Sequence, residues 1–81
     1  MTAWVQVGLK KTVLDPQGKA IQAALRQRGY GEIEELRQGK LFELRLPAGV
    51  SREQAREQVE RAAREVLTNP VIEDYSIRWE E

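Results

Sequence analysis

The chain has 81 residues, with thirteen basic and thirteen acidic side chains and neither cysteine nor histidine. This length fits one domain, residues 1–81, with a thin core that buries roughly 60% of the unfolded surface. The composition excludes disulfides, Cys/His zinc sites and nucleophile–histidine pairs. The balanced charge removes the electrostatic argument for nucleic acid binding, and a thin core without covalent staples favours association with other chains.

Hydropathy gives no indication of a membrane. No apolar run reaches the ~20 residues that a membrane-spanning helix needs. The first residues alternate in polarity instead of forming a charged and then apolar leader. We therefore expect a cytoplasmic protein with no membrane partner.

Residues 4–10 alternate between apolar and polar positions. Val5, Val7 and Leu9 share one face, which predicts a half-buried strand. Trp4 has the opposite parity and should lie on the face turned away from the helices. It is either an unremarkable exposed tryptophan or an anchor at a protein interface.

Residues 15–29 carry the signals of a helix. Asp15 suits the N-cap and Pro16 the first helical position, and Gly29 suits a left-handed end. Gly18 lies in the first turn, where alanine would be more stable by roughly 0.5–1 kcal/mol. It belongs either to a type I turn before a late helix start or to a close approach of another backbone. The apolar stripe of this helix is Ala20, Ile21, Ala24 and Leu25.

Residues 32–38 predict a weaker strand. Ile33 and Leu36 have opposite parity, so the strand either starts late or contains a bulge. Gln38-Gly39 fits a tight turn, because glycine accepts positive φ. Residues 42–46 then alternate cleanly and predict the next strand.

A second helix should begin at Ser51, with Gln54 completing a capping box, and end at Asn69-Pro70. A last strand follows over residues 73–79. Its predicted common face is Glu73, Tyr75, Ile77 and Trp79. The buried stripe predicted for the helix is Ala55, Val59, Ala62, Ala63, Val66 and Leu67.

The resulting order, β-α-β-β-α-β, predicts an α+β two-layer sandwich. A four-stranded antiparallel sheet would carry both helices on one face, in a ferredoxin-like arrangement. RNA-recognition domains share this order and stack bases on aromatic residues of their central strands. The corresponding positions here form no such platform, which argues against RNA: they are Gln6, Gly8, Glu43 and Arg45.

Candidate catalytic groups are few, because only carboxylates, lysines and tyrosines remain. Asp15 could be a general base, but its position before a proline is more typical of a helix cap. The adjacent acids Glu34-Glu35 and Glu73-Asp74 would face opposite sides of their strands and form no shared-proton dyad. No phosphate-binding glycine motif is present. We expect no catalytic, cofactor-binding or metal-binding residues in this chain.

Several motifs occur in a specific order and spacing. Leu14-Asp15-Pro16-Gln17-Gly18 follows the first strand, Arg37-Gln38-Gly39-Lys40 precedes the middle one, and Asn69-Pro70-Val71-Ile72-Glu73-Asp74-Tyr75 leads into the last. Together with Leu9-Lys10 and Gly29-Tyr30, they resemble PurS, the small subunit of phosphoribosylformylglycinamidine synthase. The resemblance covers almost the whole chain and implies a PurS-like version of the fold.

This resemblance implies a role in de novo purine synthesis. That enzyme is an ATP-dependent glutamine amidotransferase, which makes formylglycinamidine ribonucleotide from formylglycinamide ribonucleotide. Its large synthetase subunit would hold ATP and magnesium, and its glutaminase subunit would release ammonia. The PurS-like chain would be dimeric and non-catalytic, would hold the other two subunits together and would help ammonia to pass.

The resemblance also implies contact residues for the larger subunits or the homodimer. Each motif has a competing structural role: helix cap for Asp15-Pro16, turn for Gly39 and helix stop for Asn69-Pro70. Two other functions stay open, a dimeric amino-acid-sensing regulatory domain of ACT type and a stand-alone enzyme. The implied contact residues are Asp15, Pro16, Gln17, Gly18, Arg37, Gly39, Lys40, Asn69 and Pro70.

Overall fold

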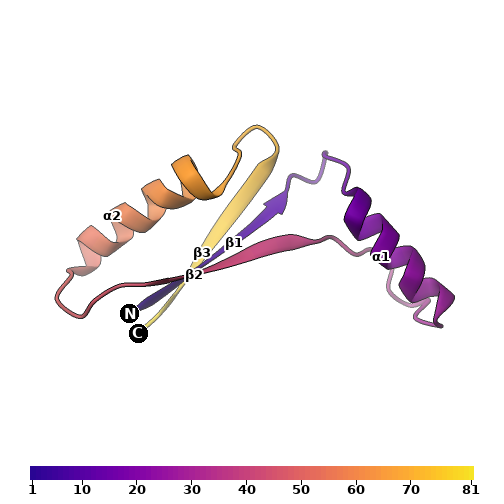
Figure 1. Cartoon of the computed structure of the whole chain (residues 1–81), viewed down its shortest axis with the longest axis horizontal. Coiled ribbons are helices and arrows are strands. Elements are labelled where there is room, and N and C mark those ends of the chain that lie inside the picture. The colour runs from indigo at the N-terminus through magenta and orange to yellow at the C-terminus, as the bar shows by residue number, and fades with distance from the viewer.

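The computed structural model describes residues 1–81 and contains one antiparallel sheet and two α-helices (Figure 1). The second helix continues directly into a π-helical turn, η1. In chain order the elements are β1 (Thr2–Leu9), α1 (Pro16–Gln27), β2 (Gly39–Arg45), α2 (Arg52–Ala62), η1 (Ala63–Leu67) and β3 (Glu73–Glu80).

The sheet has the order β2-β1-β3, with β1 antiparallel to both neighbours. Val5 at its centre lies opposite Phe42 of β2 and Ile77 of β3. The alternation in β1 and β3 therefore turns the predicted apolar faces toward α2. The buried core is Ala3, Val5 and Val7 of the sheet with Val59 and Ala63 of the helix.

Helix α2 begins as predicted, since the Gln54 amide donates to the Ser51 hydroxyl at 3.1 Å. Its end differs. The hydroxyl of Thr68 donates to the Ala63 carbonyl at 2.7 Å, where the chain passes through η1. Val66, predicted to be buried, is 77% exposed. An apolar stripe predicted with a period of 3.6 residues no longer follows the buried face in η1, because a π-turn bonds residue i to residue i+5.

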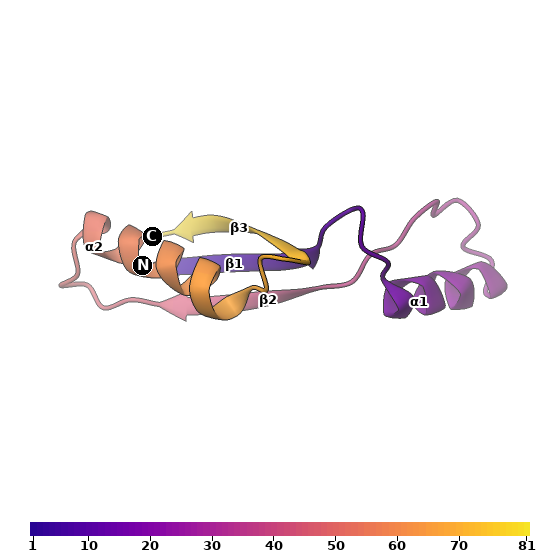
Figure 2. The ribbon, with the colours of Figure 1, turned by 90° about the horizontal axis from the view of Figure 1, so that it is seen from above.

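Helix α1 lies beyond the end of the sheet and not on its face (Figures 1 and 2). The molecule measures 51 × 27 × 13 Å, and its radius of gyration is 16.2 Å. A compact chain of this length would have a radius of gyration of about 12 Å. We call residues 10–38 the paddle, because α1 and its return segment project from the tip of the β1–β2 hairpin.

The predicted fold class, an antiparallel α+β fold, is confirmed, but the order of elements is β-α-β-α-β. The sheet has three strands instead of four, because residues 32–38 form no strand. Within that segment, the backbone of Glu34 and Leu36 is bonded to the Gln22 side chain of α1 instead. The predicted Gln38-Gly39 turn is wrong. Gly39 begins β2 and lies opposite Gly8, so the hairpin continues through this point.

The sheet face away from α2 carries Trp4, as its parity predicted. The Arg78 guanidinium lies 5.9 Å from the centre of the Trp4 ring, within the range of a cation–π contact. The indole Nε1 is buried and has no acceptor. Apart from Trp4 and the exposed Leu41, β1 and β2 show only polar residues and glycine on this face.

Candidate interaction site at the base of the paddle

All nine predicted contact residues lie around one end of the sheet. Asp15 to Gly18 start α1, Arg37 to Lys40 lead into β2, and Asn69-Pro70 precedes β3. The antiparallel register brings the start of β2 and the start of β3 beside the end of β1. A shallow groove of about 190 Å³ opens at this end, with Gln17 and Lys40 among its lining residues.

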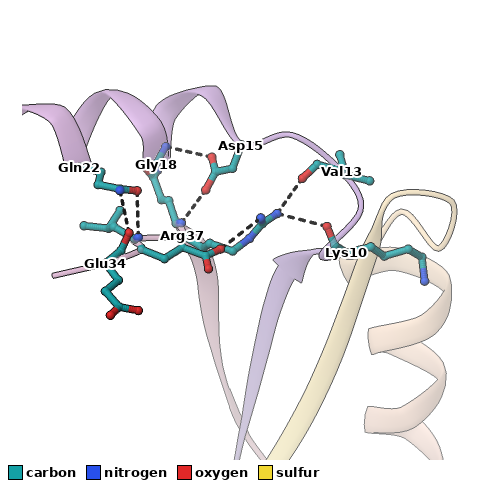
Figure 3. Close-up of polar contacts among 10 residues, drawn as sticks. Lys10, Val13, Asp15, Gly18, Gln22, Glu34 and Arg37 are labelled. Atoms are coloured by element: carbon teal, nitrogen blue, oxygen red, sulfur yellow. Dashed lines mark hydrogen bonds and ion pairs between the residues drawn. The ribbon is translucent and has the colours of Figure 1, made fainter.

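Asp15 joins the helix to the segment that returns toward the sheet. Its Oδ1 accepts a hydrogen bond from the Gly18 amide at 3.0 Å, which confirms the predicted N-cap. Its Oδ2 accepts from the Gln38 amide at 2.8 Å. The residue is only 6% exposed. Both carboxylate oxygens are therefore committed to backbone contacts (Figure 3).

These contacts change the ionisation of the carboxyl group. The hydrogen bonds from the Gln38 and Gly18 amides hold the pKa of Asp15 below its ordinary value of 3.8, and the nearby Arg37 charge acts in the same direction. Burial opposes them, because it disfavours the charged form. A carboxylate with a lowered pKa is a poor proton acceptor near neutrality, so the geometry fits the cap and not the general base.

Arg37 connects the two sides of the paddle base. Its guanidinium donates to the carbonyl of Lys10 at 3.2 Å and to that of Val13 at 2.7 Å. The Lys10 amide in turn donates to the Ile72 carbonyl at 2.8 Å, and the Lys10 ammonium pairs with Asp74 at 2.7 Å. Lys10 thus joins the paddle to the sheet.

Gln22 is a member of this site that the sequence patterns missed. Its Nε2 donates to the Glu34 carbonyl at 2.9 Å, and its Oε1 accepts from the Leu36 amide at 3.3 Å (Figure 3). The side chain thereby takes the place of a neighbouring strand for this segment. No motif marks Gln22, and only its burial and its two hydrogen bonds in the structure identify it.

Two motif glycines are required by close contacts within the chain. A Cβ on Gly18 would overlap Asp15 Oδ2 and lie 2.9 Å from the Leu36 carbonyl oxygen. A Cβ on Gly39 would lie 2.5 Å from the Val7 carbonyl oxygen. The close-approach interpretation of Gly18 is therefore confirmed, and the approaching backbone belongs to the same chain.

The Asn69-Pro70 motif forms the turn before β3. The Val71 amide donates to Asn69 Oδ1 at 3.1 Å, and the Asn69 amide donates to the Glu73 carboxylate at 2.8 Å. The same Glu73 lies 3.6 Å from the Lys40 ammonium, so it links two of the predicted segments. Glu73 belongs to the same motif but was not among the predicted contact residues.

Helix α1 leaves most of its apolar stripe exposed, and only Leu25 of the stripe is half-buried. The helix buries only Gly18 and Gln22, whereas Ile21 is 42% exposed. The stripe was expected to pack on the sheet, and its exposure results from the position of α1 beyond the sheet. The large exposed apolar side chains of the paddle are Leu14, Ile21, Tyr30 and Ile33.

Acid is expected to loosen the paddle, because the pKa of Asp15 is lower in the folded chain. Its contribution to stability is present above the unfolded pKa, near 3.8, and disappears as the pH falls through the lower folded value. Amide hydrogen exchange at Gly18 and Gln38, corrected for the intrinsic pH dependence, should accelerate in that interval. Asp15→Asn should remove this extra dependence, and an unchanged profile in the variant would contradict the assignment.

The structure contains no group of three or more His, Cys, Asp or Glu side chains that could hold a metal ion. Neither α-helix is both long and apolar enough to cross a bilayer. The polar groups at the base of the paddle instead bond mainly to backbone atoms of the chain itself.

The antiparallel sheet with α2 on one face defines a small α+β protein, whose order β-α-β-α-β lacks one strand of the ferredoxin-like order. The chain belongs to the PurS family. The family model described as phosphoribosylformylglycinamidine (FGAM) synthase matches residues 2–81. The resemblance inferred from the three motifs is therefore confirmed.

Curated relatives agree over nearly the full length. The PurS subunit of phosphoribosylformylglycinamidine synthase from Bacillus subtilis is 42% identical over 77 residues, which are 95% of this chain and 89% of the relative. The PurS subunit from Methanocaldococcus jannaschii is 38% identical over 78 residues, covering 96% and 93%.

Solved structures agree with the fold. Bacillus subtilis PurS superimposes with a TM-score of 0.84 at 40% identity, covering 99% of this chain and 98% of the other. A chain of PurLQS from Thermotoga maritima gives a TM-score of 0.86 at 35% identity, covering 95% and 93%. Methanocaldococcus jannaschii PurS superimposes with a TM-score of 0.81 at 36% identity, covering 95% of this chain and 92% of the other. That protein is one of the subunits of formylglycinamide ribonucleotide amidotransferase in the purine biosynthetic pathway.

Proposed function

We propose that this chain is the non-catalytic assembly subunit of phosphoribosylformylglycinamidine synthase in de novo purine biosynthesis. It would hold the synthetase and glutaminase subunits together, with ATP and magnesium bound on the synthetase. The observation that carries this proposal is the match to PurS over residues 2–81, together with a similar chain in the PurLQS structure of Thermotoga maritima.

The chemistry of the site supports an assembly role. Asp15, the strongest candidate for a general base, uses both carboxylate oxygens on backbone amides. Arg37, the most connected cation of the site, donates to two backbone carbonyls. Groups committed in this way shape a surface but do not transfer protons. We also propose that the groove beside Gln17 and Lys40 contacts a larger subunit and that ammonia passes along this groove.

The apolar side of α1 supports a homodimer. A ferredoxin-like sheet normally packs against two helices on one face, but only α2 lies on this one. Phe42 and Leu44 on the same face are only half-buried. A second copy would lay its α1 beside α2, and the two chains would exchange helices symmetrically. Each large apolar side chain buried in this way contributes roughly 1.5–3 kcal/mol.

Reconstitution tests the assembly role. Adding this chain to its cognate synthetase and glutaminase should raise the glutamine-dependent rate severalfold, because ammonia is then released beside the acceptor site. The rate with ammonium salt as nitrogen donor should change little, because the reaction itself belongs to the synthetase. Steady-state assays with both nitrogen donors measure the two rates.

An unchanged glutamine-dependent rate would remove the assignment. Thermal shifts with free amino acids separate it from the sensor alternative. A sensor is stabilised by its ligand by RT ln(1 + [L]/Kd), whereas an assembly subunit should respond to its protein partners.

A further inference from the structure

We infer that Asp15, Gln22 and Arg37 form a latch that keeps the paddle extended, so that α1 is offered to a second copy and not to its own sheet. This inference rests on the proposed homodimer and deepens it. In this inference, the three side chains determine whether α1 packs against its own sheet or against the sheet of a second copy.

The alternative packing is within reach of the chain. The connector of residues 10–15 can span about 20 Å when extended, which is enough for α1 to turn back over the sheet. Residues 32–38, whose pattern predicts a strand, could then pair with the free edge of β2. Packing within one chain has a large entropic advantage over association between two. Something must therefore disfavour the closed form if exchange is to occur.

The latch occupies the backbone groups that the closed form would need. A fourth strand would have to redirect the Glu34 carbonyl and the Leu36 amide, which are bonded to Gln22 at 2.9 and 3.3 Å. A turn at Gln38 would have to break the 2.8 Å bond from its amide to Asp15. The latch thus prevents residues 34–38 from pairing with the sheet of their own chain.

Arg37 fixes the direction of the paddle. Its bonds to the Lys10 and Val13 carbonyls hold the outgoing connector alongside the returning segment. Lys10 is itself bonded through its amide to Ile72 at the end of the sheet. Reversal of the connector would break this chain of contacts (Figure 3), so α1 stays beyond the end of the sheet (Figure 2).

A latch and a merely stabilising cluster differ in the effect of their removal. If the three side chains only stabilise the paddle, their loss should leave it disordered. If they select the extended form, their loss should let α1 fold back, and the isolated chain should become more compact. The apparent dimer Kd would then rise as the inverse square of the fraction of chains that stay extended, because both copies of a symmetric exchange must be extended.

The test compares wild type with Arg37→Ala and Asp15→Asn in the full chain. Arg45→Ala is the matched control, because it removes an arginine whose hydrogen bond and ion pair are with Glu43 on the exposed sheet surface, away from the paddle. Sedimentation gives the dimer Kd. The chain lacks cysteine, so spin labels at Gln27→Cys and Gln58→Cys report the distance from α1 to α2 within one chain when labelled protein is diluted into unlabelled.

We expect the latch variants to raise the dimer Kd by about tenfold or more and to shorten the label distance, with the control unchanged. A Kd within about twofold of wild type, or a broadened distance without shortening, would overturn the latch. The two proposals can fail separately. A monomeric wild type with a long label distance would refute the homodimer alone, whereas a short distance in that monomer would refute the latch.

Discussion

Replacing Gly18 with alanine is expected to lower the stability of the chain by about 2 kcal/mol, the reverse of what this change does in most helices. Glycine inside a helix usually costs roughly 0.5–1 kcal/mol relative to alanine, so the exchange normally stabilises. Here the new methyl group would overlap Asp15 Oδ2 and lie 2.9 Å from the Leu36 carbonyl oxygen. The carboxylate can move aside only by giving up Gln38, and the carbonyl belongs to backbone that Gln22 holds in place.

Urea unfolding of Gly18→Ala beside Gly31→Ala provides the measurement. A Cβ on Gly31 would meet nothing within 4 Å, and its φ is not positive, so this control should be close to neutral. The Gly18 variant should also weaken self-association and complex formation by more than its loss of stability accounts for, because the whole paddle is displaced. Equal stability of the two variants would contradict the close packing of α1 against Leu36.

Local signals account for most of the elements that the sequence predicted correctly. The alternation in β1, the Asp15 cap, the left-handed Gly29 and the Ser51 cap all depend on residues within a few positions of one another. Such signals can be recognised in the sequence without knowledge of the tertiary structure. The motif residues at the base of the paddle are local in the same sense, since each motif is a short continuous run.

Most of the incorrect predictions depend on distant partners, whereas the burial of Val66 fails for a local reason, the π-turn of η1. Residues 32–38 have the composition of a strand, but Gln22 satisfies their backbone from a helix twelve or more positions earlier. Gly39 suits a turn by type, yet it is glycine because the Val7 carbonyl approaches from the adjacent strand. The stripe of α1 predicted an amphipathic helix correctly, and periodicity does not say whether its apolar side meets the same chain or another.

Ile21→Glu is expected to raise the dimer Kd by about 100-fold or more while leaving the isolated chain folded. Ile21 is 42% exposed in the single chain, so a carboxylate there stays hydrated and costs little. In the proposed dimer the same position is covered by the sheet of the second copy, where an unpaired charge is strongly unfavourable. A substitution that separates folding from association in this way identifies the surface directly.

Ala23→Glu is the control, because it adds the same charge to an exposed position of the same helix. Two residues of an α-helix are separated by about 200° of rotation, so this position lies on the side away from Ile21. Sedimentation equilibrium measures both Kd values, and far-ultraviolet circular dichroism confirms that α1 persists. Equal self-association of the two variants would show that the stripe of α1 is not the contact between copies. If Ile21→Glu blocked binding to the synthetase or glutaminase but left the dimer intact, the exposed stripe would belong to the larger partner, and the sheet face beside α2 would need another explanation.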